Sequence, residues 1–137
     1  MRFLLDTNVV CEATSRQPSP QVLAWCAEHI ADCALSAITL GEIWKGIHLL
    51  PAGKRRNSLA TWASGIESDF PDRILPLDPA MMKEWGKLYA KHQAAGFNMT
   101  VLDSLIAATA VAHGLTVATR NTSDFPSDLR TINPWNG

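Results

Sequence analysis

Four acidic residues, Asp6, Glu42, Asp103 and Asp124, lie just past short apolar runs that are typical of buried strands. If these runs are neighbouring strands of one parallel sheet, the acids meet at one edge, because sites in open α/β sheets lie beyond the carboxyl ends of the strands. Carboxylates without Cys or His at metal-binding spacing suit a hard cation such as Mg2+ or Mn2+. Such sites most often act on phosphate esters, so the pattern predicts metal-dependent phosphodiester chemistry.

Each acid also has a purely structural interpretation. Asp6 fits the N-cap of a first helix. Glu42 stands three residues after Thr39, which makes a capping box, and the third acid stands in the same relation to Thr100. The fourth acid fits an ordinary loop. Both interpretations stay open for any single acid, whereas the shared position of all four favours a site.

Size and composition describe a single globular domain over residues 1–137, with 47% apolar and 18% charged residues. The net charge of −1 gives no general attraction for nucleic acid, so any basic contact surface must be local. Cys11, Cys26 and Cys33 lack metal-binding spacing, and we expect reduced thiols. No signal peptide precedes Asp6 and no apolar run is long enough to span a membrane, so we expect a cytoplasmic protein without a membrane partner.

Strands and helices are expected to alternate along the chain. The apolar runs predict strands at residues 3–5, 33–36, 73–75, 115–119 and 131–132. Helices are expected at residues 7–15, 20–30, 39–50, 54–66, 78–95 and 100–113, with Gly114 as a C-terminal cap. This order predicts an α/β fold, in which a short parallel sheet of four to five strands has helices on both faces.

Four segments also carry a family resemblance: LLDTN from Leu4, LSAITLGEI from Leu35, LDSLIAATAVAHGL from Leu102 and VATRNTSDF from Val117. In order and spacing they resemble the PIN domain, and more narrowly the VapC/FitB type of toxin from prokaryotic toxin–antitoxin pairs. With the closing residues 132–135, the resemblance spans nearly the whole chain. It implies the three-layer PIN-like sandwich and a Mg2+-dependent endoribonuclease in which Mn2+ can substitute.

The resemblance also assigns roles to residues of this sequence. By motif, the metal-binding and catalytic acids are Asp6, Glu42 and Asp103, with a fourth position at either Asn121 or Asp124. We expect Asp124 to be the acid and Asn121 to be a neutral ligand or a hydrogen-bond donor. The residues expected to orient the carboxylates by hydrogen bonds are Asn8, Thr119 and Asn121.

The remaining polar and aromatic residues keep two interpretations each. Arg120 and Lys45 could contact RNA phosphate, or could form salt bridges that temper the acidic cluster. The triplet at residues 54–56 (Lys-Arg-Arg) fits a solvated helix start or a contact with RNA or a protein partner. The five tryptophans favour packing over base stacking. The four histidines are expected at the surface or at helix ends, outside the site: His29, His48, His92 and His113.

Three functions compete for this chain. The leading one is a toxin ribonuclease that cleaves RNA and is held inactive by a cognate antitoxin, a small DNA-binding protein whose tail reaches the acidic pocket. A haloacid-dehalogenase-like phosphatase would need a second Asp where Asn8 stands, and also a Lys that is missing. A catalytically silent PIN-like binding module would not need four acids. A surplus of apolar residues between Trp44 and Trp62 further predicts a homodimer and a higher assembly with the antitoxin.

Overall fold

A parallel sheet with β1 at its centre organises residues 1–136, the part of the chain that this computed structural model describes. The strands are β1 (Phe3–Leu5), β2 (Cys33–Ser36), β3 (Ile74–Leu75), β4 (Thr116–Ala118) and β5 (Thr131–Ile132). Their order is β3-β2-β1-β4-β5, and every neighbouring pair is parallel. The number and direction of strands agree with the sequence-based prediction.

The helices that connect these strands are α1 (Thr7–Cys11), α2 (Pro20–His29), α3 (Ala37–His48), α4 (Lys54–Ser64), α5 (Ile66–Asp69), α6 (Pro79–Ala94) and α7 (Val101–His113). Three short 3-10 turns, η1 (Glu12–Thr14), η2 (Ile30–Asp32) and η3 (Thr122–Asp124), complete the described elements. No helix within residues 1–136 is long and apolar enough to cross a membrane.

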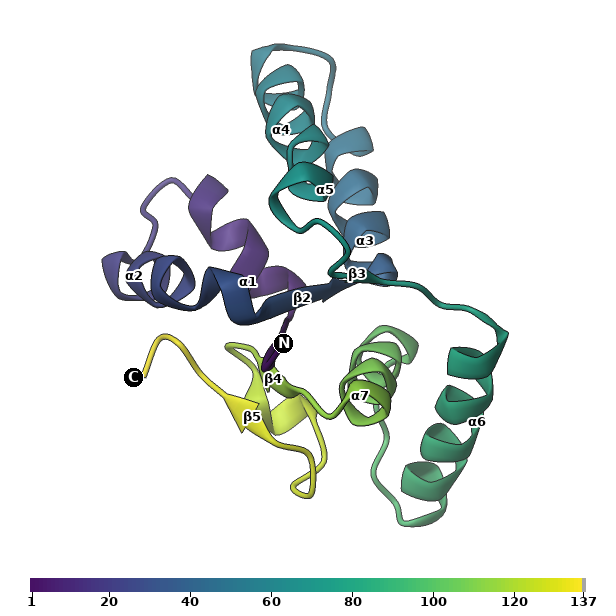
Figure 1. The fold of residues 1–137 in the computed structure, drawn as a ribbon. Coiled ribbons are helices and arrows are strands. Elements are labelled where there is room, and N and C mark those ends of the chain that lie inside the picture. Colours follow the sequence, from purple (N-terminus) through teal and green to yellow (C-terminus); the bar gives the residue numbers. More distant parts are fainter. Residues whose placement is uncertain (137) are drawn as a thin grey trace.

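The two faces of the sheet carry separate hydrophobic cores. Side chains alternate along a strand, so Phe3 and Leu5 enter one core with residues of α1 to α5, whereas Leu4 enters the other. The second core is built on α7, against which α6 packs from outside (Figure 1). The sheet therefore lies between two helical layers, which confirms the three-layer architecture.

The order of the strands creates a switch point beside β1. From β1 the chain moves first to β2 on one side and only later to β4 on the other. The carboxyl ends of β1 and β4 are joined where the Asp6 N–H donates to the Ala118 carbonyl over 2.9 Å. Ligands of open α/β sheets bind at such a point, so the topology brings Asp6 and Thr119 to its edge.

Local cap signals place most helix starts where the sequence predicts them. Ser19, Asp78 and Thr100 are the N-caps of α2, α6 and α7. The side chain of each accepts a hydrogen bond from the backbone N–H of the residue three positions later. Gly114 ends α7 in the left-handed conformation, with φ of 67°.

The capping box predicted at Thr39 is wrong. Helix α3 begins earlier, because Ser36 ends β2 and its hydroxyl accepts from the Ile38 N–H over 3.2 Å, so strand passes directly into helix. Thr39 is instead fully buried, and its hydroxyl has no hydrogen-bond partner among the described residues. Glu42 is therefore free of a capping role.

Two predicted helices are interrupted in the structure. The one expected at residues 7–15 ends at Cys11 and tightens into η1, and the one expected at residues 54–66 breaks at Gly65 before the short α5. Neither interruption changes the order of elements, because each lies within a single connection on one face of the sheet.

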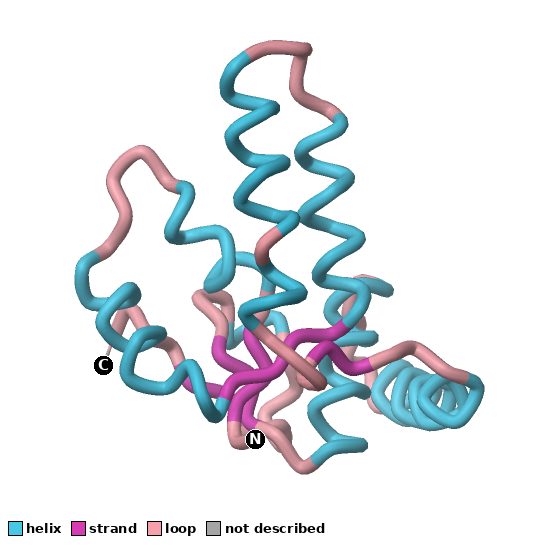
Figure 2. The backbone as a smooth tube through the Cα atoms, turned by 45° about the horizontal axis from the view of Figure 1, so that its top comes forward, coloured by secondary structure: helices cyan, strands magenta, loops and turns pink. Residues whose placement is uncertain are grey.

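Helices α3 and α4 form an antiparallel hairpin that projects from the sheet, and Figure 2 shows its tip standing clear of the other elements. Lys54 and Arg55 are exposed at this tip, where α4 begins. Leu49, at the end of α3, leaves 78% of its surface exposed. The hairpin thus presents both charge and apolar surface away from the core.

Two glycine-to-alanine substitutions should have opposite effects on stability. Gly114→Ala should lower the free energy of unfolding by about 1 kcal/mol, because a Cβ strains the left-handed backbone although nothing lies within 4 Å of it. Gly86→Ala, inside α6 and equally uncrowded, should raise it by about 0.5–1 kcal/mol. Urea melts of both variants check this, and equal shifts would contradict the role of φ at Gly114.

Candidate active site

Asp6 is the most constrained of the four acids. It is 8% exposed at the end of β1 and caps α1 by accepting from the Thr7 N–H over 2.8 Å through Oδ1. Its Oδ2 accepts from the Thr119 hydroxyl over 2.8 Å and from the Asn8 amide over 3.3 Å. The cap and the site therefore use different oxygens of one carboxylate, so the structural and functional interpretations of Asp6 are compatible.

Thr119 connects the other members of this hydrogen-bond network. It directly follows β4, is fully buried, and accepts from the Asn121 N–H over 3.1 Å while it donates to Asp6. Asn8 spans the network, because its amide also lies 3.4 Å from the Thr119 hydroxyl and its carbonyl oxygen accepts from the Arg120 N–H over 3.2 Å. The contacts expected of Asn8 and Thr119 are present, and both residues orient Asp6.

Glu42 reaches the same edge from α3. The Thr7 hydroxyl donates to Glu42 Oε1 over 2.7 Å, which links α1 to α3. Burial raises the pKa of Glu42 above its usual value; the Thr7 hydrogen bond and the charge of Lys45 lower it, and the charges of Asp6 and Asp103 raise it. Lys45 therefore lies close enough to act on Glu42 electrostatically, but forms no ion pair with it among the described residues.

Asp103 lies in the first turn of α7, where its N–H donates to the Thr100 hydroxyl over 3.1 Å. Burial raises the pKa of Asp103; the hydrogen bond with Thr100 lowers it, and the charges of Asp6 and Asp124 raise it. The positive end of the α7 dipole lies at the same turn and favours a carboxylate there.

The four acids are linked electrostatically at this edge of the sheet, and their sharing of one metal pocket stays a prediction. Asp6 acts electrostatically on both Glu42 and Asp103, and Asp124 acts on Asp103 from the exposed turn η3. Asn121 joins the network through its backbone N–H, and its side chain is exposed. The arrangement of these two residues is consistent with Asp124 as the fourth acid.

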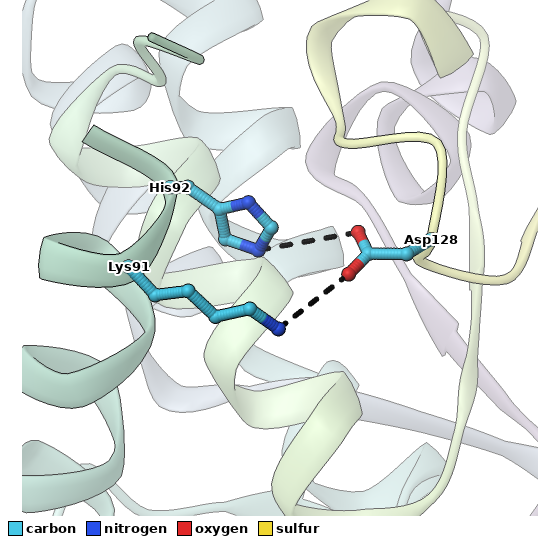
Figure 3. Close-up of polar contacts among 3 residues, drawn as sticks. All are labelled: Lys91, His92 and Asp128. Atoms are coloured by element: carbon cyan, nitrogen blue, oxygen red, sulfur yellow. Dashed lines mark ion pairs between the residues drawn. The ribbon is translucent and has the colours of Figure 1, made fainter. Parts of the chain in front are cut away.

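No cation among the described residues forms an ion pair with this cluster. The ion pairs among the described residues lie elsewhere and join Asp128 to Lys91 over 3.8 Å and to His92 over 4.0 Å (Figure 3). The salt-bridge interpretation of Arg120 is therefore wrong: its guanidinium carbon lies 5.0 Å from the centre of the Trp135 ring instead. Arg120 is exposed, and its backbone N–H contacts Asn8 of the acid network.

The donor set suits a hard divalent cation. All four side chains offer carboxylate oxygens, and they act on one another as like charges without a salt-bridge partner. In this arrangement no three His, Cys, Asp or Glu side chains of residues 1–136 are placed so that they could already hold a metal ion. The chemistry of the site fits such an ion, although the side chains are not yet placed to hold it.

One member of the network escapes the sequence-based prediction. The sequence predicts no role for Thr7 beyond the motif around Asp6, yet its hydroxyl hydrogen-bonds Glu42. The two residues are 35 positions apart, so only the packing of α1 against α3 brings them together.

A separate cavity of about 300 Å³ lies between α6, α7 and residues 126–129, and none of the four acids lines it. His92 and Asp128 face each other across its wall (Figure 3). His92 is 9% exposed, so it is buried rather than at the surface, where α6 turns it inward against Phe97. It lies in the last turn of α6, which is the helix-end position that the prediction also allowed.

Comparison with known proteins matches this arrangement. Residues 3–127 fit the family model described as the PIN domain. The VapC ribonuclease Y4jK of Sinorhizobium fredii is 42% identical over 136 residues, which cover 97% of each protein. The toxin FitB of Neisseria gonorrhoeae is 40% identical and covers 97% of this chain and 98% of the relative. The crystal structure of FitAcB from the same organism has a TM-score of 0.89 at 39% identity, with 97% and 98% covered.

Asp103→Asn should stabilise the metal-free protein at neutral pH. The folded state raises the pKa of Asp103, so the ionised carboxylate costs stability above that raised pKa, and the cost disappears as pH falls below the unfolded value. Thermal melts with a chelator should show a higher Tm for the variant at neutral pH and a shrinking difference towards acid pH.

The matched control is Asp128→Asn, which removes an equal charge outside the cluster and should not raise the Tm, because Asp128 is ion-paired. A large fall in the Tm of Asp103→Asn would make this acid a structural cap.

Proposed function

This chain belongs to the PIN-domain family, and from that premise we propose that it is a metal-dependent endoribonuclease, the toxin of a type II toxin–antitoxin pair. The names of its relatives, a VapC ribonuclease and a FitB toxin, support the activity and the biological role. We further propose that it acts in the cytoplasm on RNA.

The observation that carries the proposal is the unneutralised acid cluster at the switch point of the sheet. Asp6, Asp103 and Asp124, with Glu42, would hold Mg2+ or Mn2+. When bound, such an ion lowers the pKa of a coordinated water and offsets charge on a phosphodiester.

The chain's own residues orient the ligands of that ion. Thr119 and Asn8 fix one oxygen of Asp6, and Thr7 fixes one oxygen of Glu42, which leaves their remaining lone pairs for the cation. A bound ion would supply this chemistry without a histidine acting as a base. This agrees with His92 lining a separate cavity that the four acids do not line.

The phosphatase alternative loses its support at Asn8. A haloacid-dehalogenase-like enzyme uses an acid at that position, but here the amide donates to Asp6 Oδ2. An amide that donates to the first acid cannot also act as a proton-accepting carboxylate. A silent binding module would not account for four acids kept close at a cost in mutual repulsion.

Cleavage of single-stranded RNA should depend on the acids and on added metal. Asp6→Asn should abolish Mg2+-dependent cleavage, because a ligand charge is lost, while Asp128→Asn should retain it. Gel assays with Mg2+, Mn2+ and a chelator, compared with hydrolysis of a generic phosphomonoester, check this. Cleavage that persists in the chelator, or phosphomonoester turnover alone, would refute the proposed chemistry.

Asp124 should contribute more to metal binding than Asn121. A carboxylate binds a divalent ion more strongly than an amide does, so Asp124→Ala should weaken Mn2+ affinity more than Asn121→Ala. Titration calorimetry of both variants measures the difference. An inactive Asn121→Ala beside a near-normal Asp124→Ala would place the fourth ligand at Asn121.

The exposed apolar surface supports the proposed partners. Leu49 is 78% exposed at the projecting hairpin, and Leu23 and Ile30 expose more than a third of their surface along and just after α2. These exposed apolar side chains are candidate contacts for a protein partner. We propose that the chain forms a homodimer and binds an antitoxin whose tail places an Arg or Lys at the acidic edge, in place of the metal.

The purified chain should run as a dimer by light scattering, and its RNA cleavage should stop when the antitoxin is added. Leu49→Asp should weaken the assembly with the antitoxin, because a charge replaces an apolar contact, whereas Leu49→Met should preserve it. A strictly monomeric chain whose cleavage ignores the antitoxin would contradict both proposed partners.

A further inference from the structure

The C-terminal segment after β5 folds back onto Arg120. The Asn133 side-chain amide donates to the Arg120 carbonyl over 3.3 Å, and the Trp135 N–H donates to Asn133 Oδ1 over 2.9 Å. This turn places the Trp135 ring 5.0 Å from the guanidinium carbon of Arg120, within the range of a cation–π interaction.

Arg120 is tied to the acidic edge on its other side. Its N–H donates to Asn8 Oδ1 over 3.2 Å, and the Asn8 amide donates to Asp6 Oδ2 over 3.3 Å. The backbone of Arg120 is thus held between the acid network and the C-terminal segment. A side chain that starts from a fixed backbone and rests on an aromatic ring loses few further conformations on binding a ligand.

The charge of Arg120 is exposed and has no ion-pair partner among the described residues. Trp135 differs, since it is partly buried and packs against the first core. The ring therefore acts as a fixed platform, and a cation–π contact orients the guanidinium without neutralising it. Its fork of N–H donors stays available for a phosphate, which it can bind through two parallel hydrogen bonds.

We propose that Trp135 and Asn133 are positioning residues that hold the Arg120 guanidinium beside the acidic cluster, where it binds an RNA phosphate next to the scissile one. This inference rests on the proposed ribonuclease function. Four clustered carboxylates repel an RNA backbone, so a fixed cation at their border supplies local attraction that the net charge of −1 does not. The C-terminal segment thereby becomes part of substrate binding.

Steady-state cleavage of a short RNA tests the proposal. Arg120→Gln should raise KM by about tenfold or more, the effect of losing a charge-assisted contact, with kcat nearly unchanged. Trp135→Leu keeps apolar bulk in the core but removes the π face, and should raise KM by about two- to fivefold. Trp135→Phe keeps an aromatic face and should restore most of the loss.

Two further variants separate the positioning role from general effects. In the Arg120→Gln background, Trp135→Leu should change KM no further, because the ring acts through the guanidinium. Arg130→Gln is the charge control: it removes an equal charge from a residue that binds the Gly114 carbonyl at the amino end of β4, and should leave KM unchanged. If Trp135→Leu raises KM by the same factor in the wild type and in the Arg120→Gln background, the proposal is overturned.

NMR of the arginine side chains reports the Arg120–Trp135 contact without any activity measurement. The Arg120 side-chain protons, assigned by their loss in Arg120→Gln, should be shifted upfield by the Trp135 ring, should return to ordinary positions in Trp135→Leu and should stay shifted in Trp135→Phe. Unshifted protons in the wild type would overturn the proposed Arg120–Trp135 contact. If the shifts appear but the wild type cleaves no RNA, the proposed ribonuclease function fails, whereas the positioning of Arg120 by Trp135 stands.

Discussion

The mutual repulsion of four carboxylates at one sheet edge is the constraint on which the rest of the structure depends. Asp6 and Thr119 meet there because β1 and β4 are paired in parallel, and α3 and α7 bring the second and third acids to them. Partial burial raises the pKa of Glu42 and of Asp103, and the neighbouring like charges add to the effect. The scaffold must therefore supply enough packing and enough hydrogen bonds to keep the acids together.

The scaffold does so mainly with neutral donors. Hydroxyls of Thr7 and Thr119 and the amide of Asn8 hold the carboxylates, while the nearest cations remain unpaired with them. A lysine or arginine within the cluster would stabilise the folded chain but would compete with a metal ion for the same oxygens. Neutral donors fix geometry and preserve the negative charge of the cluster, which the proposed metal site requires.

Several elements follow from local rules that the sequence displays. Buried strands appear as apolar runs, and Ser19, Asp78 and Thr100 cap helices through contacts within three residues. The error at α3 shows the limit of such rules. Thr39 and Glu42 have the spacing of a capping box, but Ser36 lies at the strand end and captures the helix start. Two competing caps are equivalent in sequence, and burial of Thr39 in the folded chain decides between them.

For the site, the sequence by itself identified four candidate acids and predicted the edge at which they would gather, because strand ends and helix starts are local signals and parallel order fixes their side. Only the tertiary structure decided how the acids are held and where Arg120 points. The Thr7–Glu42 hydrogen bond and the Arg120–Trp135 contact join residues distant in sequence, or separated by a strand. Such contacts depend on how layers pack, and packing is set by the volume and shape of the whole core rather than by any local pattern.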